Sequence, residues 1–456
     1  MSFSSLSFLY AFLPTVLILY CLSPSPRLKN AVLLLSSLFF YAWGAPKALP
    51  LLLGTALLVW LCALGMEKGL RFCYLPAVAF VLGSLLLFKY LGFFADMFGL
   101  RGQVPALLLP AGISFTSFQL LAYLFDLRRG EIRAERSFFR FLLFVTFFPQ
   151  LLQGPILRYR ETAPMLGARS VTWGGAVAGM RRFLQGLAKK VLLADQVAVL
   201  AASIYGSSRY VGTGALWLAA LCYTLQIYFD FSGYSDMAVG LGQLFGFTLP
   251  ENFNYPYTAL SVTDFWRRWH ITLSLWFRDY VYIPLGGNRV SRRRWICNLL
   301  TVWALTGLWH GASWNFVLWG LYYGVLLLIE KLIIGRRIER IPTFLRWLVT
   351  FSLVNLGWVF FHISDAQTLL SVLRTMFVYR PTAWRALLAL DTSICSKLCA
   401  LPFALLFSFP VIRHRAAAEK STMCTALAGA RLFALLLVCI MFIISASFTP
   451  FIYFNF

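Results

Sequence analysis

The chain has 456 residues, of which 60% are hydrophobic and only 12% are charged, whereas soluble domains carry about a quarter charged residues. With a mean hydropathy of +0.75, this composition excludes an ordinary soluble fold. The net charge of +23 does not predict a nucleic-acid partner, because the Lys and Arg residues stand in short clusters between apolar runs, as the positive-inside rule describes.

Apolar runs of bilayer-spanning length, about 20 residues, recur from the first residues to the last. Backbone in hydrocarbon must satisfy its own hydrogen bonds, and these runs are continuous rather than alternating like barrel strands. We therefore predict an all-α fold, a polytopic helical bundle in the lipid bilayer. Since no repeat or long linker divides the chain, we expect a single domain over 1–456. The candidate spans are 5–22, 30–44, 48–66, 73–94, 105–125, 138–157, 183–205, 213–230, 297–311, 313–334, 345–362, 396–412 and 431–449.

The first five candidate spans predict the orientation of the chain. Basic residues follow the first, third and fifth spans (Arg27 and Lys29, Lys68 and Arg71, and 128–136), whereas the links after the second and fourth spans contain few. Lys and Arg gather on the cytoplasmic side of a membrane. We therefore expect the N-terminus to be extracytoplasmic.

The run 138–157 interrupts this alternation. Strict alternation would place the following link outside, yet that link contains several arginines, beginning with Arg158. Pro149, Gly154 and Pro155 interrupt the run itself. Irregular backbone at membrane depth is tolerated only where it is buried in protein or lines a wet cavity, so we predict a re-entrant segment beside a cavity.

Two acids, Asp230 and Asp236, lie in the apolar stretch QIYFDFSGYSDMAVGLG. Carboxylates at membrane depth are costly and usually face a functional interior or a water-filled cavity. The alternatives are that they lie near a solvated helix end or pair with basic residues for structure alone, and we favour structural pairing.

The stretch 264–289 is too charged to span a membrane. On a helical wheel its aromatic residues share one face and its arginines lie off it, which predicts a helix lying in the membrane interface. His270 falls at the edge of the aromatic face. It could contact lipid headgroups, or it could turn inward to the protein.

His310 lies inside the otherwise apolar run TVWALTGLWHGASWNFVLWG. Trp303, Gly307, His310 and Trp314 recur at helical spacing and are predicted to line one face. A buried neutral histidine can act as a general base near physiological pH. The alternative, an interhelical hydrogen bond that only stabilises the bundle, remains open at this point.

The other histidines and the nine cysteines give no sign of a metal site. His362 ends a candidate span and is expected at the membrane interface, while His414 lies in a basic link and is expected to be solvated. The cysteines lack zinc-ligand spacing, and Cys395 and Cys399 are expected to stack on one helix face.

Several ordered motifs resemble the membrane-bound O-acyltransferase (MBOAT) family, and most closely its bacterial branch of membrane subunits for alginate and peptidoglycan O-acetylation. The resemblance runs from about residue 41 to 324, with its core at about 105–330. It is carried by DFWRRWHITLSLWFRDYVYIPLGGNR, GLWHGASWNFVLWG, YFDFSGYSDMAVGLG, ENFNYPY, LPAGISFTSFQ and FPQLLQGPILRY.

The resemblance implies a helical bundle around a tunnel, with His310 as catalytic base and His270 as a second functional histidine that orients donor or acceptor. Trp309, Trp303 and Asn315 are further candidate substrate-binding residues, together with Asp236 and Arg267. Arg267, Arg268 and Arg278 could attract the phosphates of a CoA-like donor, or they could only anchor the chain at the membrane surface.

The function implied is acyl transfer, most simply of acetyl, from a cytoplasmic thioester such as acetyl-CoA toward an extracytoplasmic polysaccharide or cell-wall glycan. The thioester is a substrate, and no bound cofactor is expected. The location implied is the bacterial cytoplasmic (inner) membrane, and a periplasmic partner protein is expected because a large polymer is unsuited to threading to a recessed histidine. The alternatives are D-alanyl transfer to teichoic acid, and a transporter or flippase for a polar lipid or glycan.

Overall fold

The computed structural model describes residues 1–100, 102–105, 107–207, 211–385, 388, 397–411, 422–445 and 451. Within these residues every regular element is helical, as predicted. The α-helices are α1 (Leu13–Leu22), α2 (Pro26–Gly44), α3 (Leu49–Glu67), α4 (Tyr74–Leu85), α5 (Leu91–Met97), α6 (Ile113–Arg129), α7 (Phe138–Thr146), α8 (Tyr159–Gly167), α9 (Trp173–Ala188), α10 (Asp195–Gly206), α11 (Thr213–Leu244), α12 (Val262–Arg268), α13 (Ile271–Phe277), α14 (Arg292–His310), α15 (Trp314–Ile329), α16 (Thr343–His362), α17 (Ala366–Phe377), α20 (Ala400–Phe407) and α21 (Thr422–Ser445).

Several helical stretches are long and apolar enough to cross a membrane, which confirms the polytopic membrane fold. These are Pro46–Glu67, Arg71–Met97, Thr213–Leu244, Trp314–Ile334 and Thr343–His362, with shorter apolar helices at Phe8–Leu22 and Gly429–Ser445. Other expected spans have different bounds. The run 183–205 is part of one longer helical stretch formed by α9, the π-helix η5 (Lys189–Ala194) and α10. The ends of the runs 396–412 and 431–449, with Cys395 and His414, lie outside the described residues.

Helix α11 is longer than the predicted span 213–230, and its two acids pair with basic residues of neighbouring elements. Asp230 accepts a hydrogen bond from Lys190 at 2.6 Å, and Asp236 accepts from Lys189 at 2.6 Å and from Arg182 at 2.9 Å. The three basic residues come from α9 and η5. The structural pairing favoured from the sequence is therefore confirmed.

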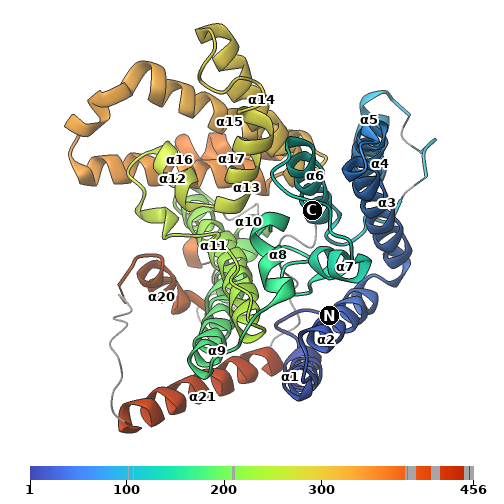
Figure 1. Ribbon diagram of the computed structural model, residues 1–456. Helices are drawn as coiled ribbons and strands as arrows, with labels where there is room; N and C mark the ends of the chain where they lie inside the picture. Colours follow the sequence, from blue (N-terminus) through green and yellow to red (C-terminus); the bar gives the residue numbers. More distant parts are fainter. Residues whose placement is uncertain are drawn as a thin grey trace.

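Small residues bring α9 and α11 into backbone contact, and Figure 1 shows the two helices side by side. A Cβ atom on Gly186 would lie 2.5 Å from the carbonyl oxygen of Gly233, and a Cβ on Gly240 would lie 2.5 Å from that of Gly179. Contacts between small residues are the usual means of close helix approach in membranes. The ion pairs of α11 are held across this tight contact.

The interruption predicted in 138–157 is present. Helix α7 ends at Thr146, and the chain continues to Arg158 in buried turns rather than in a spanning helix. Ser37 accepts a hydrogen bond from the backbone N–H of Phe148, and Thr272 accepts one from that of Ile156. Side chains from other elements thus satisfy irregular backbone, as membrane depth requires.

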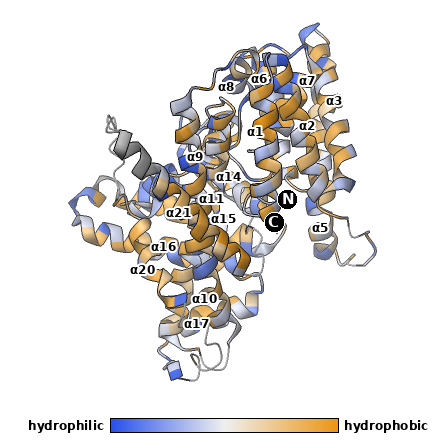
Figure 2. Ribbon diagram, turned by 90° about the horizontal axis from the view of Figure 1, so that it is seen from below, coloured by the Kyte–Doolittle hydropathy of each residue, from blue (hydrophilic) through white to orange (hydrophobic). Residues whose placement is uncertain are grey.

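The apolar interior of the described residues contains two large hydrophobic clusters and a small third one around Leu85, Tyr90 and Ile113. One large cluster is built mainly from α1–α3, α6, α7, α9 and the second half of α11, and the other from α10, the first half of α11, α12 and α14–α17. Figure 2 shows hydrophobic residues along these helices and hydrophilic residues near the α6–α7–α8 end. Trp309 belongs to the first cluster and Trp319 to the second, so the two clusters meet around the residues beside His310.

Candidate active site

His310 is the last residue of α14, at the tip of a hairpin made by α14 and α15. The two helices pack closely because a Cβ on Gly307 would lie 2.2 Å from the carbonyl oxygen of Phe316, and a Cβ on Gly320 would lie 2.2 Å from that of Trp303. Only hydrogen fits at these two positions. The hairpin therefore fixes the place of His310.

The predicted face of Trp303, Gly307, His310 and Trp314 is only partly correct. Helix α14 ends at His310 because Gly311 is extended, with φ −171° and ψ 156°. Trp314 begins α15 instead, and it is 57% exposed. The prediction placed Trp314 on the same face because it assumed one continuous helix across the turn between α14 and α15.

Aromatic rings surround the buried His310 side chain. The centre of its imidazole lies 5.0 Å from Trp309, 4.9 Å from Trp319 and 5.3 Å from Phe361. His310 is 2% exposed. Such a site excludes bulk water, which is the setting in which a neutral imidazole can serve as a base.

His270 lies at a break between two short helices, so the single interfacial helix predicted for 264–289 is wrong. Helix α12 ends at Arg268 and α13 begins at Ile271, while His270 adopts a left-handed backbone with φ 44°. The break is stabilised by the segment before α12. Asn252 accepts backbone hydrogen bonds from Ile271 and Thr272, at 3.0 and 3.2 Å.

The break turns His270 into the protein, which excludes the headgroup contact considered from the sequence. The side chain is 1% exposed, and its ring centre lies 4.7 Å from Phe231 and 5.7 Å from Trp309. Neither ring nitrogen has a hydrogen-bond partner among the described residues. Burial lowers the pKa of His270 to about 3, so the ring is neutral. Trp309 contacts both histidines.

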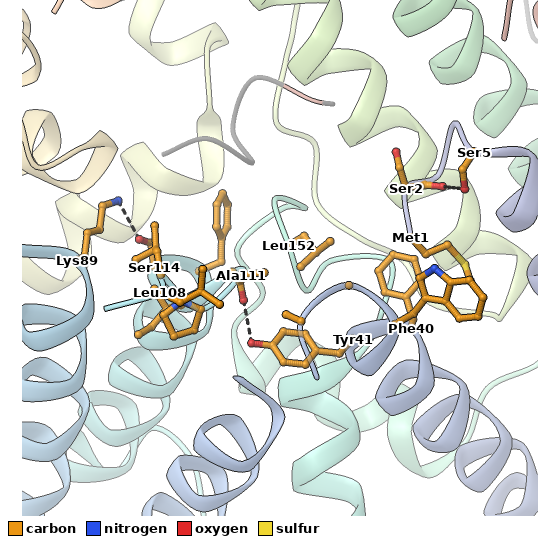
Figure 3. Close-up of a pocket in the computed structure, with 18 of the residues that line it drawn as sticks. Met1, Ser2, Ser5, Phe40, Tyr41, Lys89, Leu108, Ala111, Ser114 and Leu152 are labelled. Atoms are coloured by element: carbon orange, nitrogen blue, oxygen red, sulfur yellow. Dashed lines mark hydrogen bonds between the residues drawn. The ribbon is translucent and has the colours of Figure 1, made fainter. Parts of the chain in front are cut away.

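His310 and Trp309 line a cavity of about 740 Å³, the volume of a small-molecule site. Figure 3 shows side chains from well-separated parts of the chain around this cavity, among them Tyr41, Lys89, Ser114 and Leu152. Tyr41 donates a hydrogen bond to the carbonyl oxygen of Ala111 at 3.1 Å. The lining is mostly apolar, with polar side chains from Ser2, Ser5, Ser7, Tyr41, Lys89 and Ser114. His270 is not among the lining residues.

Comparison with known proteins gives this arrangement a family. The sequence model of the membrane-bound O-acyltransferase family matches residues 114–373, which contain both histidines. The chain belongs to this family. It is therefore an acyltransferase, and the family predicted from the sequence motifs is confirmed.

Relatives of this O-acyltransferase have related activities. One is a probable alginate O-acetylase AlgI from Pseudomonas aeruginosa, which is 41% identical to this chain. The alignment covers 83% of this chain and 75% of the relative. Another is a peptidoglycan O-acetyltransferase from Helicobacter pylori, which is 37% identical. That alignment covers 82% of this chain and 79% of the relative. A teichoic acid D-alanyltransferase from Bacillus subtilis is 30% identical over 55% of the chain and 68% of its own length.

The remaining predicted site residues of this O-acyltransferase lie away from the cavity lining. Trp303 is buried with its ring centre 4.7 Å from Trp266, and Asn315 donates to the carbonyl oxygen of Phe361 at 3.1 Å. Asp236 lies in the ion-pair cluster of α11. These contacts give Trp303, Asn315 and Asp236 structural roles, and their predicted part in substrate binding stays a prediction.

The arginines proposed for a donor phosphate do not gather in one place. Arg267 is exposed on α12, Arg268 pairs with Asp264 at 2.8 Å, and Arg278 pairs with Asp279 at 2.6 Å. Burial alone would raise the pKa of Asp279, but hydrogen bonds from Arg278 and Arg158 outweigh it and lower that pKa.

A second hollow, of about 520 Å³, contains a different set of arginines. It is lined by Arg129, Arg158 and Arg160 together with three acids and Tyr280. Arg158 pairs with Asp279 at 2.8 Å, and Arg160 is 39% exposed. The sequence showed these arginines only as an irregularity in the topology, since nothing in it indicates that 129, 158 and 160 meet.

Sequence reasoning missed Lys89, which lines the cavity, and its neighbour Tyr90, which caps α14 outside the cavity lining. Lys89 and Tyr90, at the end of the π-helix η4 (Leu86–Tyr90), donate hydrogen bonds to the last turn of α14. Lys89 reaches the carbonyl oxygen of Trp309 at 2.5 Å, and Tyr90 that of Leu308 at 2.6 Å. A lone lysine in the apolar run 73–94 was the available signal, because ionisable residues at membrane depth are functional candidates.

Proposed function

We propose that this O-acyltransferase moves an acetyl group from a cytoplasmic thioester, such as acetyl-CoA, toward an extracytoplasmic polysaccharide or cell-wall glycan. The observation that carries the proposal is the position of His310, a buried imidazole at the end of α14 that lines a cavity of about 740 Å³. The cavity has room for an acyl group and an acceptor hydroxyl beside this base.

In the proposed reaction the acceptor oxygen attacks the carbonyl carbon of the thioester while His310 takes the hydroxyl proton. The carbonyl re-forms, the carbon–sulfur bond breaks, and the leaving thiolate takes the proton back from His310. The apolar walls of the cavity limit water, which would otherwise hydrolyse the thioester. His270, neutral and buried against Trp309, is a group that orients one of the substrates.

The two hollows support transfer across the membrane. Residues that line the His310 cavity include Met1, Gly44 and Ala45, and Leu108 and Leu109. They lie at the N-terminus, at the end of α2 and between α5 and α6, where basic residues are few. The second hollow is lined by arginines of the links rich in them. By the positive-inside rule the cavity opens to the outside and the arginine hollow faces the cytoplasm.

This orientation gives each hollow a role. The arginine hollow receives the phosphate-bearing part of the donor, because arginine binds phosphate well. The cavity receives the acceptor. A polymer is too large to reach His310, so a periplasmic partner protein carries the acyl group onward. The membrane is the bacterial cytoplasmic membrane, in keeping with the bacterial relatives.

The coverage of the relatives favours acetyl over D-alanyl transfer. The alginate O-acetylase aligns with 83% of the chain at 41% identity. The teichoic acid D-alanyltransferase aligns with only 55% of the chain, at 30% identity. Membership of an acyltransferase family favours an enzyme over a transporter or flippase.

The test is thiol release from acetyl-CoA by purified protein in nanodiscs, with the His310→Ala variant. The matched control is His362→Ala, because His362 ends α16 and packs against Tyr205 and Tyr223 instead of the cavity. We expect turnover in the unmodified chain and in His362→Ala, and a loss of about 10²–10⁴-fold in His310→Ala, the usual contribution of a general base. A folded His310→Ala protein with unchanged turnover would overturn the proposal. Turnover of a D-alanyl carrier thioester alone would replace the acetyl donor.

A further inference from the structure

Lys89 lies before the residues that the family model matches, which begin at residue 114. It lies in the apolar stretch Arg71–Met97 and lines the same cavity as His310. Its ammonium donates to the Ser114 hydroxyl at 3.0 Å and to the Trp309 carbonyl at 2.5 Å. Figure 3 shows the bond to Ser114 at one end of the cavity.

The charge of Lys89 has no counter-ion among the described residues. No carboxylate in the part of the chain that the structure describes forms an ion pair with its nitrogen within 4.0 Å, and the residues that line the cavity include neither Asp nor Glu. A cation away from water is costly unless an anion accompanies it. The acids of α11, by contrast, are all paired. The charged form of Lys89 would therefore gain its missing partner if negative charge developed on a bound ligand.

One hydrogen of the Lys89 ammonium is available to such a ligand. An ammonium has three N–H donors, and the described residues accept two of them. Both acceptors are neutral. The third N–H can therefore point to the space beside His310 without breaking an existing contact.

Lys89 and His310 are also held in a fixed relation. Tyr90, the next residue, donates to the carbonyl oxygen of Leu308, while Lys89 donates to that of Trp309. The last carbonyls of a helix lack partners within it, so these two side chains close the last turn of α14. A π-helical turn such as η4 is frequent at functional sites. The base and the cation thus belong to one rigid assembly.

We propose that Lys89 is a catalytic residue of this O-acyltransferase, whose third ammonium N–H binds the acyl oxygen as it becomes an oxyanion. This inference rests on the proposed function. When the acceptor oxygen attacks the thioester, the electron pair of the C=O bond moves to the acyl oxygen. The proton of the acceptor hydroxyl moves to His310. Lys89 stabilises that charge until the C=O bond re-forms and the thiolate leaves with the proton from His310. No further reactant is needed.

Three variants separate this role from helix capping. Lys89→Gln keeps an N–H donor for the Trp309 carbonyl but removes the charge, Lys89→Arg keeps the charge, and Tyr90→Phe removes only the neighbouring cap. We measure thiol release from acetyl-CoA in nanodiscs, with thermal unfolding of each protein. Loss of one oxyanion donor costs about 10²–10³-fold in kcat, so we expect that loss in Lys89→Gln with KM for the donor little changed. Lys89→Arg should retain about a tenth of the turnover or more, and Tyr90→Phe should stay within about tenfold.

The outcomes divide as follows. A folded Lys89→Gln protein with the turnover of the unmodified chain, or with no greater loss than Tyr90→Phe, would overturn the proposal. If Lys89→Gln does not fold, Lys89→Arg decides, because a folded Lys89→Arg protein as inactive as His310→Ala contradicts a role for the charge. Absence of thioester turnover in the unmodified chain contradicts the proposed function instead. The two failures are therefore distinguishable.

Discussion

Two polar regions of the molecule lie among apolar helices, and they differ in how their charges are compensated. On α11, Asp230 and Asp236 each meet basic side chains from α9 and η5 at 2.6–2.9 Å. At the α14 tip, Lys89 has no carboxylate partner among the described residues, and His270 has no hydrogen-bond partner for either nitrogen. Of these two regions, the compensated charges of α11 serve structure, and the uncompensated polar groups at the α14 tip indicate chemistry.

The largest expected effect on stability comes from breaking the compensated region. Lys190 is 2% exposed on its side chain and pairs with Asp230 at 2.6 Å and Asp195 at 2.8 Å. Lys190→Met removes the Lys190 ammonium from the buried carboxylate of Asp230 and from the partly exposed carboxylate of Asp195, which should cost about 3–5 kcal/mol. Thermal or denaturant unfolding in detergent measures this loss. The double variant Lys190→Met with Asp230→Asn should recover part of it, and no recovery would contradict the pairing account.

The hairpin that places His310 is the next most sensitive point. In Gly307→Ala the added Cβ would lie 2.2 Å from the carbonyl oxygen of Phe316, so α14 and α15 must separate and His310 must move. Misplacement by about 1 Å can cost about 10²-fold in rate, which thiol-release assays would detect. The control is Gly54→Ala on α3, where a Cβ meets nothing within 4 Å. Equal turnover of the two variants would show that the hairpin contact does not position the base.

Two substitutions of His270 distinguish the effect of backbone strain on stability from the effect of the side chain on catalysis. Its φ of 44° lies in the left-handed region that asparagine tolerates better than most residues. His270→Asn should therefore keep the unfolding temperature while lowering thioester turnover about tenfold to hundredfold. His270→Leu should lower both, because a bulky residue strains the break. Normal turnover in a folded His270→Asn protein would make His270 a structural residue, like the acids of α11.

The smallest expected effect is at the arginine hollow. Arg160 is 39% exposed and pairs with Glu131 at 2.7 Å, so its contribution to a donor phosphate is screened by solvent and amounts to about 0–1 kcal/mol. Arg160→Gln should raise KM for acetyl-CoA by about two- to fivefold. Arg267→Gln, on the exposed side of α12, should leave KM unchanged. A raised KM in Arg267→Gln with an unchanged KM in Arg160→Gln would instead indicate a donor site at α12, as the sequence suggested.

The sequence predicted the membrane fold and singled out His310 because each has a local signal, whereas the role expected of His270 came from the family resemblance. Apolar length predicts spans, and a histidine within an apolar helix is unusual enough to notice. It did not predict the break at His270, because the wheel of 264–289 treats the stretch alone, whereas the break depends on backbone hydrogen bonds with Asn252. Tertiary contacts of this kind leave no periodic pattern.

Lys89 and the arginine hollow were missed for a related reason. Lys89 is one cation in an apolar run, and only the fold brings it to the carbonyl oxygen of Trp309, 220 positions along the chain. Arg129 and Arg158 belong to separate links that meet at Asp279. Pairwise contacts across such separations follow from helix packing, which the sequence motifs do not describe.

The central claim, that the compensated charges of α11 serve structure and the histidine centre performs acyl transfer, has one direct test. Thiol release per folded molecule and unfolding temperature are measured together for His310→Ala and Asp236→Asn. The account predicts that His310→Ala keeps its unfolding temperature and loses turnover by about 10²–10⁴-fold, while Asp236→Asn unfolds at a lower temperature and keeps its turnover. An active His310→Ala protein, or a stable Asp236→Asn protein without activity, would contradict it.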